Sequence, residues 1–251
     1  MPRGLIAVTG VSANYVWALG YYGDNTSGPA TVSRDVFMHW DGTSWTLVPS
    51  PRFQQTKGVS AMGDLSPVSS SDVWAVGGTL NGFGEHSGPG SALVEHWDGN
   101  GWSQATPPPG EVPLSRVAAT ARADVWAVQG GQIVSAEGSD LIGRVGVVHW
   151  NGQAWSASLS LPDADGTVIT DITAPASNDV WVVGMQGGRP LIRHWNGRRW
   201  VTPKGADSPE IRKSPYIWLT SVSHTAKGAV VAFGSEQDPA APPQNRLWVS
   251  C

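Results

Sequence analysis

Two aspartates and one arginine share a position in an internal repeat. Asp64, Arg116 and Asp171 each lie ten residues before the Trp of a segment such as Val73-Trp74-Ala75-Val76. Paired carboxylates can divide acid and base roles, and a guanidinium between them can hold an anionic group or lower the pKa of a neighbouring carboxyl. We therefore expect Asp64, Asp171 and Arg116 to be catalytic. The alternative is a buried cluster of ion pairs that joins neighbouring elements.

A second group of residues could bind a ligand from irregular segments between the repeated ones. Aromatic side chains beside Gly-rich loops suit stacking on sugar rings or other flat ligands. His86 follows Glu85 in such a loop and could act as an acid–base group. The expected ligand-binding residues are Tyr216, Trp218, His86, Glu85 and Phe53.

No metal site and no cofactor are expected. The four repeated histidines occur once per repeat, too far apart in a ring of repeats to share a metal. We expect each to bond to the Asp of a neighbouring hairpin: His39, His96, His149 and His194. Asp163 and Asp165 resemble half of a calcium loop. No Glu follows at the required distance, so a plain turn is favoured over calcium.

These residues are positioned by a repeat of about fifty residues. The segment Val-Trp-Ala-Val-Gly and its variants recur at successive spacings of 57, 52, 55 and 50 residues, and the fifth copy has lost its Trp. A second segment, such as His96-Trp97-Asp98-Gly99-Asn100-Gly101-Trp102, follows each of the first four copies. The fifth copy reaches only Leu247-Trp248. Five copies cover the chain.

Each copy is typical of four short strands. The first begins 12 residues before the Trp position, as at Leu5 and Met62, the second is the Val-Trp segment, and the third ends in His-Trp. Asp-Gly or Asn-Gly then predicts a tight hairpin to the fourth strand. The pattern predicts an all-β, five-bladed β-propeller with four antiparallel strands per blade, the last blade lacking its outer strand. We expect one domain over 1–251, with blades at about 1–50, 56–107, 111–162, 166–204 and 215–251.

The two ends of such a propeller differ in their sequence behaviour. The hairpin turns at one end repeat almost unchanged, whereas the loops at the other end diverge in length and composition, as in Gly78–Ser91 and Gly130–Gly146. Functional loops depart from the pattern of a rigid scaffold, so the variable end is the expected working face. The five residues at the position of Asp64 also diverge, and they are expected near the mouth of the central channel: Ala7, Asp64, Arg116, Asp171 and Ser221.

The repeat resembles Trp-rich bacterial β-propeller repeats, on the strings Asp72-Val73-Trp74-Ala75-Val76-Gly77 and His96-Trp97-Asp98-Gly99-Asn100-Gly101-Trp102. Its Asp-Gly-x-x-Trp turn is also similar to the Asp-box of sialidase-type propellers, Ser-x-Asp-x-Gly-x-x-Trp. It lacks one residue between Asp and Gly, and His stands in the Ser region. The resemblance spans the chain and implies architecture, while propellers host many activities.

Composition excludes several classes of protein. The net charge is −4, so no basic excess is available to neutralise phosphates, and a nucleic-acid binder is not expected. No apolar run approaches the ~20 residues of a membrane helix, and no signal peptide is visible. The single cysteine, Cys251, excludes an internal disulfide framework. A monomer is expected, either secreted by a bacterium or cytosolic.

Three functions remain open. The first is an enzyme of hydrolase or lyase type, acting on a glycan or small polar metabolite at the channel mouth through Asp64, Arg116 and Asp171. This resembles the placement of carboxylates on inner strands in glycoside hydrolases built on five-bladed propellers. The second is a carbohydrate-binding lectin, similar in architecture to tachylectin-type binders. The third is a scaffold for protein partners, which would expose a large apolar patch.

Overall fold

The computed structural model is all-β and describes residues 4–22, 34–51, 59–80, 90–110, 112–135, 138–161, 167–206, 217–225, 228–236 and 244–250. Its strands in chain order are β1 (Gly4–Ser12), β2 (Tyr15–Tyr22), β3 (Arg34–Trp40), β4 (Trp45–Val48), β5 (Val59–Ser69), β6 (Asp72–Leu80), β7 (Ala92–Trp97), β8 (Trp102–Gln104), β9 (Leu114–Ala121), β10 (Asp124–Ser135), β11 (Gly138–Trp150), β12 (Trp155–Ser160), β13 (Val168–Ala176), β14 (Asp179–Gln186), β15 (Arg189–Trp195), β16 (Trp200–Val201), β17 (Ile217–His224), β18 (Val230–Glu236) and β19 (Gln244–Ser250).

Each sequence repeat forms one antiparallel sheet. Four sheets have four strands, in the orders β1-β2-β3-β4, β5-β6-β7-β8, β9-β10-β11-β12 and β13-β14-β15-β16. The fifth has three strands, β17-β18-β19, among the residues that the structure describes. This agrees with the expectation of a last repeat without an outer strand.

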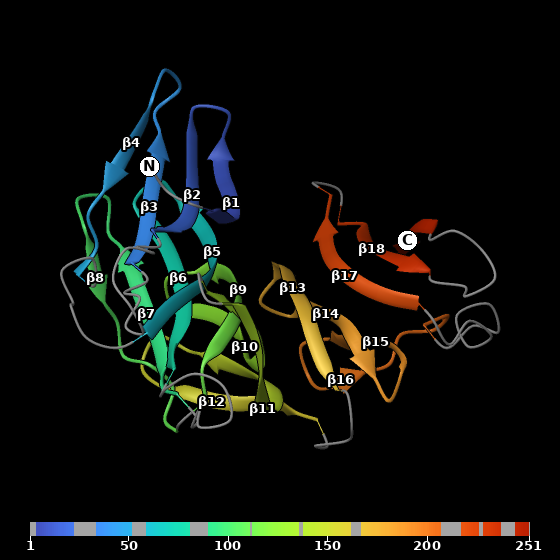
Figure 1. Ribbon diagram of the computed structural model, residues 1–251. Coiled ribbons are helices and arrows are strands. Elements are labelled where there is room, and N and C mark those ends of the chain that lie inside the picture. The colour runs from blue at the N-terminus through green and yellow to red at the C-terminus, as the bar shows by residue number, and fades with distance from the viewer. Residues whose placement is uncertain are drawn as a thin grey trace.

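The sheets follow one another through contacts of their first strands. β1 contacts β5, β5 contacts β9, β9 contacts β13, and β13 contacts β17. Figure 1 shows this propeller-like succession, with β1 and β17 standing apart at its two ends. The sequence favours a ring closed by packing of the last blade on the first, but within the described part of the chain no comparable contact joins β17 to β1.

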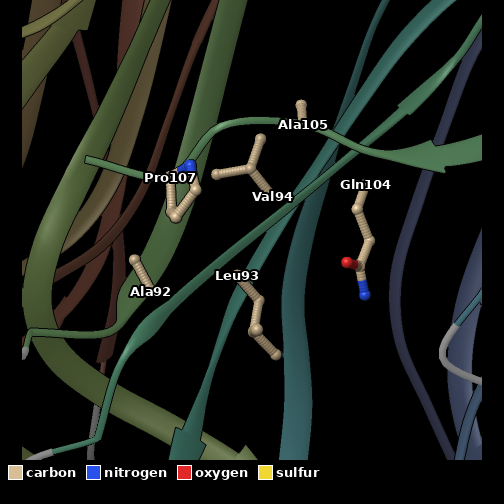
Figure 2. Close-up of a pocket in the computed structure, with 6 residues that line it drawn as sticks. All are labelled: Ala92, Leu93, Val94, Gln104, Ala105 and Pro107. Atoms are coloured by element: carbon tan, nitrogen blue, oxygen red, sulfur yellow. The ribbon is translucent and has the colours of Figure 1, made fainter. Parts of the chain in front are cut away.

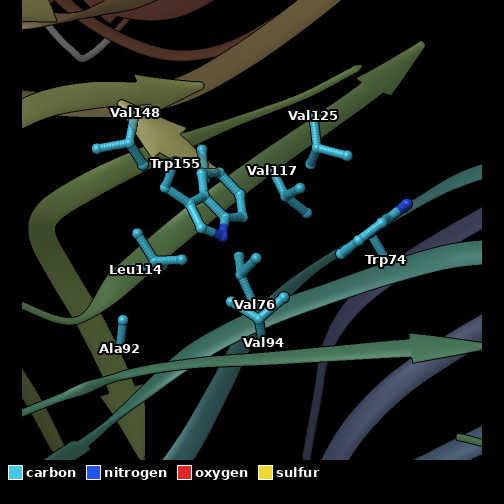
Figure 3. Close-up of a cluster of buried hydrophobic side chains, with 10 residues drawn as sticks. Trp74, Val76, Ala92, Val94, Leu114, Val117, Val125, Val148 and Trp155 are labelled. Atoms are coloured by element: carbon cyan, nitrogen blue, oxygen red, sulfur yellow. The ribbon is translucent and has the colours of Figure 1, made fainter. Parts of the chain in front are cut away.

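The core lies between successive sheets rather than within any one of them. One cluster combines Val76 and Val94 of the second sheet with Leu114 and Val117 of the third, and Trp155 covers it from β12 (Figure 3). Equivalent clusters join the first sheet to the second, the third to the fourth and the fourth to the fifth. Because both faces of an inner sheet are covered, its strands are almost continuously apolar.

The third and fourth strands are joined by the tight turns that the sequence predicts. Gly42, Gly99, Gly152 and Gly197 all have φ between 84° and 98°, a conformation that favours glycine. The Asp or Asn before each glycine accepts hydrogen bonds from the amides two and three residues later, as Asp98 does from Asn100 at 2.8 Å and from Gly101 at 3.0 Å. A Cβ on these glycines would contact the turn between the first two strands. Both sets of turns therefore form one end of the molecule, called here the hairpin end.

Some strands extend further than the repeat predicts. The loop expected at 130–146 is mostly a hairpin, since β10 and β11 remain paired as far as Ser135 and Gly138. β5 begins at Val59, which places Asp64 in mid-strand rather than near the start. None of the described segments is a helix that could cross a lipid bilayer.

Candidate functional site

A β-bulge precedes the position of Asp64, Arg116 and Asp171 in the first strand of every sheet. The register shifts lie between Leu5 and Ala7, Met62 and Asp64, Leu114 and Arg116, Ile169 and Asp171, and Leu219 and Ser221. A bulge adds one unpaired residue and changes the direction of the next side chain. The β-bulge is therefore the same in every sheet, and only the residue that follows it differs from sheet to sheet.

The bulges of β5 and β9 approach each other closely. Gly63 is the extra residue in β5, and a Cβ on it would lie 2.9 Å from the carbonyl oxygen of Ser115, the extra residue in β9. Real Cβ atoms do not approach backbone oxygen so closely, so glycine is required for this approach. The contact brings the segment of Asp64 against the segment of Arg116.

Asp64 connects two sheets through its two carboxylate oxygens. Oδ1 accepts a hydrogen bond from the amide of Leu65 at 2.8 Å, and Oδ2 accepts one from the amide of Val117 in β9 at 3.0 Å. A carboxylate has about four lone-pair sites, so two accepted bonds leave capacity for a ligand. Asp64 thus has a structural contact and retains free acceptor capacity.

Asp171 makes the equivalent contact from the fourth sheet to the fifth. Its Oδ1 accepts from the amide of Ile172 at 2.9 Å. Its Oδ2 accepts from the amide of Val222 at 2.8 Å and from the hydroxyl of Ser221 at 2.9 Å. The additional hydroxyl distinguishes Asp171 from Asp64, because it further favours the ionised form of the carboxyl.

Arg116 lies on β9, the strand between β5 and β13, and it is partly buried. Its Nη1 donates to the carbonyl of its neighbour Ser115 at 2.7 Å. Among the residues that the structure describes, no ion pair joins this guanidinium to Asp64 or Asp171. The remaining donors of a guanidinium, which has five N–H groups, are available for other acceptors.

The three charges nevertheless influence one another. Burial raises the pKa of Asp64 to about 7, while the amide of Val117 and the charge of Arg116 act in the opposite direction and the charge of Asp171 raises the pKa further. Burial also raises the pKa of Asp171, opposed by the hydrogen bonds from Val222, Ser221 and Ile172 and by Arg116. We call Asp64, Arg116 and Asp171 the inner cluster.

The other residues expected at a site are only partly within the described structure. Trp218 lies on β17 with 42% of its surface exposed. Tyr216, His86, Glu85 and Phe53 lie outside the described residues, as do Asp163 and Asp165 of the weak calcium hypothesis. No group of side chains that could hold a metal ion occurs in the part of the chain that the structure describes.

Several polar contacts between sheets were not expected from the sequence. Asp35 is buried in β3 and accepts from the amide of Met62 at 3.0 Å. The hydroxyl of Ser66 accepts from the amide of Ala119 at 2.9 Å, and the hydroxyl of Thr170 donates to the carbonyl of Leu219 at 2.8 Å. These residues occupy different positions of the repeat, so no common spacing could have revealed them.

Three of the four repeated histidines bond to an Asp as expected, whereas the Nε2 of His39 has no hydrogen-bond partner among the described residues. His96, His149 and His194 bond through Nε2 to the Asp that begins the second strand of the same sheet, at 2.7, 2.6 and 2.8 Å. His149 and His194 also stack on Trp rings, with centroids 4.0 Å apart. The first sheet departs from this pattern: Tyr15 stands in place of the Asp and packs edge-on against His39.

A pocket of about 90 Å³ lies on the two outer strands of the second sheet. It is lined by strands β7 and β8 and the segment after them, through Ala92, Leu93, Val94, Gln104, Ala105 and Pro107 (Figure 2). This lining contains no ionisable side chain, and the volume falls well below the roughly 300–1,000 Å³ of small-molecule sites. The inner cluster, rather than this pocket, holds the groups that could perform chemistry.

Comparison with known proteins identifies the fold but not the family. No protein-family model matches the chain, and no curated protein is similar to it in sequence. Among solved structures, a protein of unknown function from Dyadobacter fermentans is similar with a TM-score of 0.57 and 11% identity, over 96% of this chain and 77% of that chain.

Two enzymes of known class are similar in structure to a comparable degree. The polysaccharide lyase Uly1 has a TM-score of 0.55 and 9% identity, over 97% of this chain and 56% of its own. The Hadza microbial sialidase Hz136 has a TM-score of 0.53 and 11% identity, over 92% of this chain and 52% of its own. The chain thus spans about half the length of these two proteins. At such identities the similarity establishes a β-propeller-like fold only.

Proposed function

We propose that this protein binds a carbohydrate at the inner cluster and acts on it by acid–base chemistry. One observation carries the proposal: a constant bulge directs Asp64, Arg116 and Asp171 from three successive sheets, where the first and last sheets have Ala7 and Ser221. The divergence favours a single site rather than five equal lectin sites.

The environments of the two carboxyls suggest separate roles. Asp64, with a pKa of about 7, retains a proton near neutral pH and is suited to be the general acid. Asp171 accepts three hydrogen bonds that favour its ionised form and is suited to be the general base. In a hydrolysis, Asp64 would protonate the leaving oxygen while Asp171 takes a proton from the attacking water.

Arg116 would position the ligand between the two carboxyls. It stands on the strand between theirs and is not committed to an ion pair with either, among the described residues. A free guanidinium can form a bidentate contact with a carboxylate or with vicinal hydroxyls. The enzyme classes of the two similar structures, a polysaccharide lyase and a sialidase, support a carbohydrate ligand by analogy of fold.

The proposal is tested by binding measurements on a panel of oligosaccharides of neutral hexoses, uronic acids and sialic acid. We expect at least one class to bind the wild-type protein, and we expect Arg116→Gln to weaken that binding about tenfold or more, since a charge-assisted hydrogen bond contributes about 1.5–3 kcal/mol. Arg198→Gln is the matched control, because Arg198 is exposed in a turn of the hairpin end. It should leave binding unchanged.

Two results would decide between the alternatives. Equal binding by Arg116→Gln and wild type would remove Arg116 from the site and contradict the proposal. Binding that depends on Arg116 without release of a product from any bound glycan would instead identify a lectin with one site. In that case the binding part of the proposal remains and the acid–base part fails.

A further inference from the structure

Two apolar positions on the first strand of each sheet are buried in four sheets and exposed in one. Twelve residues before the Trp position, four residues are at most 2% exposed: Met62, Leu114, Ile169 and Leu219. The equivalent Leu5 is 65% exposed. Nine residues before the Trp position, Leu65, Val117, Ile172 and Val222 are at most 5% exposed, whereas Val8 is 70% exposed. We call Leu5 and Val8 the rear face of the first sheet.

The fifth sheet, at the opposite end of the succession, also has an apolar position that is exposed there and buried in the other four sheets. Two residues after the Trp position, four residues are at most 1% exposed: Leu19, Val76, Val128 and Val183. The equivalent residue of the fifth sheet, Phe233, is 43% exposed. We call Phe233 the forward face of the fifth sheet. Each terminal sheet therefore exposes one apolar face that every inner sheet buries.

The chain forms the same interface between successive sheets four times. The two exposed faces correspond to the two sides of that interface. In each inner interface, the forward-face residue of one sheet packs with the rear-face residues of the next. Leu19 packs with Met62 and Leu65, and Val76 with Leu114 and Val117. Val128 packs with Ile169 and Ile172, and Val183 with Leu219 and Val222. By the same rule, Phe233 is complementary to Leu5 and Val8.

The same chain does not bring these halves together. The four packed interfaces fix the angle between successive sheets, and well-packed cores resist continuous deformation. With those interfaces formed, β1 and β17 stand apart at the two ends of the succession (Figure 1), and no contact like those between inner strands joins them among the described residues.

We propose that the forward face of the fifth sheet binds the rear face of the first sheet of a second copy of this chain, head to tail. The proposal continues an interface that the chain already forms four times, with the same residue positions on each side. It replaces the monomer expected from the sequence. A head-to-tail interface leaves one free face of each kind on a pair, so it forms a ring when the geometry closes and a longer chain when it does not.

The direct test is sedimentation of the full chain over a hundredfold range of concentration. The wild-type protein should have a mass of at least twice the 26.5 kDa of one chain at the upper end of the range. Val8→Glu and Phe233→Glu should each give a monomer, because a charge in either face opposes its burial. Leu47→Glu is the matched control: Leu47 is 56% exposed on β4, outside both faces, and its variant should associate like wild type. Leu5→Lys provides a second variant of the rear face if Val8→Glu fails to fold by circular dichroism.

Mixing the two monomeric variants tests the direction of the contact. Val8→Glu retains an intact forward face and Phe233→Glu retains an intact rear face, so an equimolar mixture should form dimers and stop there. Each variant alone should remain monomeric. A monomeric wild-type protein throughout the range would overturn the proposal and indicate that the faces close within one chain. Failure of the mixture to dimerise when wild type does would overturn the head-to-tail arrangement.

Discussion

The hairpin end and the inner cluster belong to the same set of sheets and follow opposite rules. At the hairpin end, each of the first four sheets repeats the same Asp-Gly or Asn-Gly turn, and three of them repeat the same His–Asp bond. At the inner cluster the backbone bulge repeats, but the side chain changes between Ala7, Asp64, Arg116, Asp171 and Ser221. Repetition at one end builds the scaffold, and divergence on the inner strands leaves room for function.

Asp64 and Asp171 also hold neighbouring sheets together. Each accepts a backbone amide from the sheet that follows, at 3.0 and 2.8 Å. A carboxyl with a purely structural role should stabilise the fold in its ionised form at neutral pH. A carboxyl retained for chemistry can be destabilising there, because function often depends on an unfavourable environment.

The largest expected effect is the pH dependence contributed by Asp64. Its pKa of about 7 in the folded state lies above the ordinary 3.8, so folding favours the protonated carboxyl. The stability gained in this way is complete below about pH 4 and is lost as the pH rises towards 7. Three pKa units correspond to at most about 4 kcal/mol. Asp64→Asn should therefore gain stability relative to wild type between pH 4.5 and 8.

Urea unfolding at these two pH values measures the difference. Asp98→Asn is the control from the hairpin end, where amide hydrogen bonds lower the pKa of an exposed carboxyl. Its stability relative to wild type should not rise with pH in this way. If the difference between Asp64→Asn and wild type were the same at pH 4.5 and pH 8, Asp64 would be an ordinary structural carboxylate, and the contrast between the two regions would be lost.

A smaller effect is expected at the hairpin end itself. His149 bonds to Asp124 at 2.6 Å, whereas the buried Nε2 of His39 has no hydrogen-bond partner among the described residues. Burial lowers the pKa of His39, which keeps its ring neutral. His149→Phe should cost about 1.5 kcal/mol of unfolding free energy, because it removes a charge-assisted hydrogen bond. His39→Phe should cost less, since it removes an unsatisfied polar atom.

Thermal or urea unfolding of the two variants at pH 7 provides the comparison. Both substitutions replace one aromatic ring by another, so packing changes are matched. Equal losses in the two variants would mean that the His–Asp bond adds nothing to the scaffold, and that the repeated histidines are retained for packing on Trp alone.

Most of the fold can be predicted from the sequence because its periodicity is strong. The Val-Trp and His-Trp segments and the glycine turns identify strands and hairpins, and the structure confirms them in β2, β6, β10 and β14. Two features were not predictable from the pattern. The long β10–β11 hairpin has no equivalent in other repeats, and the separation of β1 from β17 depends on the angle set by side-chain packing, which spacing does not encode.

The site is predictable to a lesser degree. Comparison among repeats identifies Asp64, Arg116 and Asp171 as departures from the pattern, which requires no structure. The bulge before them arises from pairing of the first two strands of each sheet, and the amides of Val117 and Val222 belong to the next sheet, more than 50 positions along the chain. The roles of Asp35, Ser66 and Thr170 arise in the same way and had no signal in the sequence.

Asp171→Asn is the decisive test of whether the inner cluster is a working site. The variant retains one oxygen that can accept the amide of Val222 while it removes the base. We predict that its melting temperature stays within a few degrees of wild type, while turnover of the glycan identified with the panel falls at least a hundredfold, the typical contribution of a general base. A large fall in melting temperature with glycan binding and turnover intact would contradict the claim and identify Asp171 as a structural link between the fourth and fifth sheets.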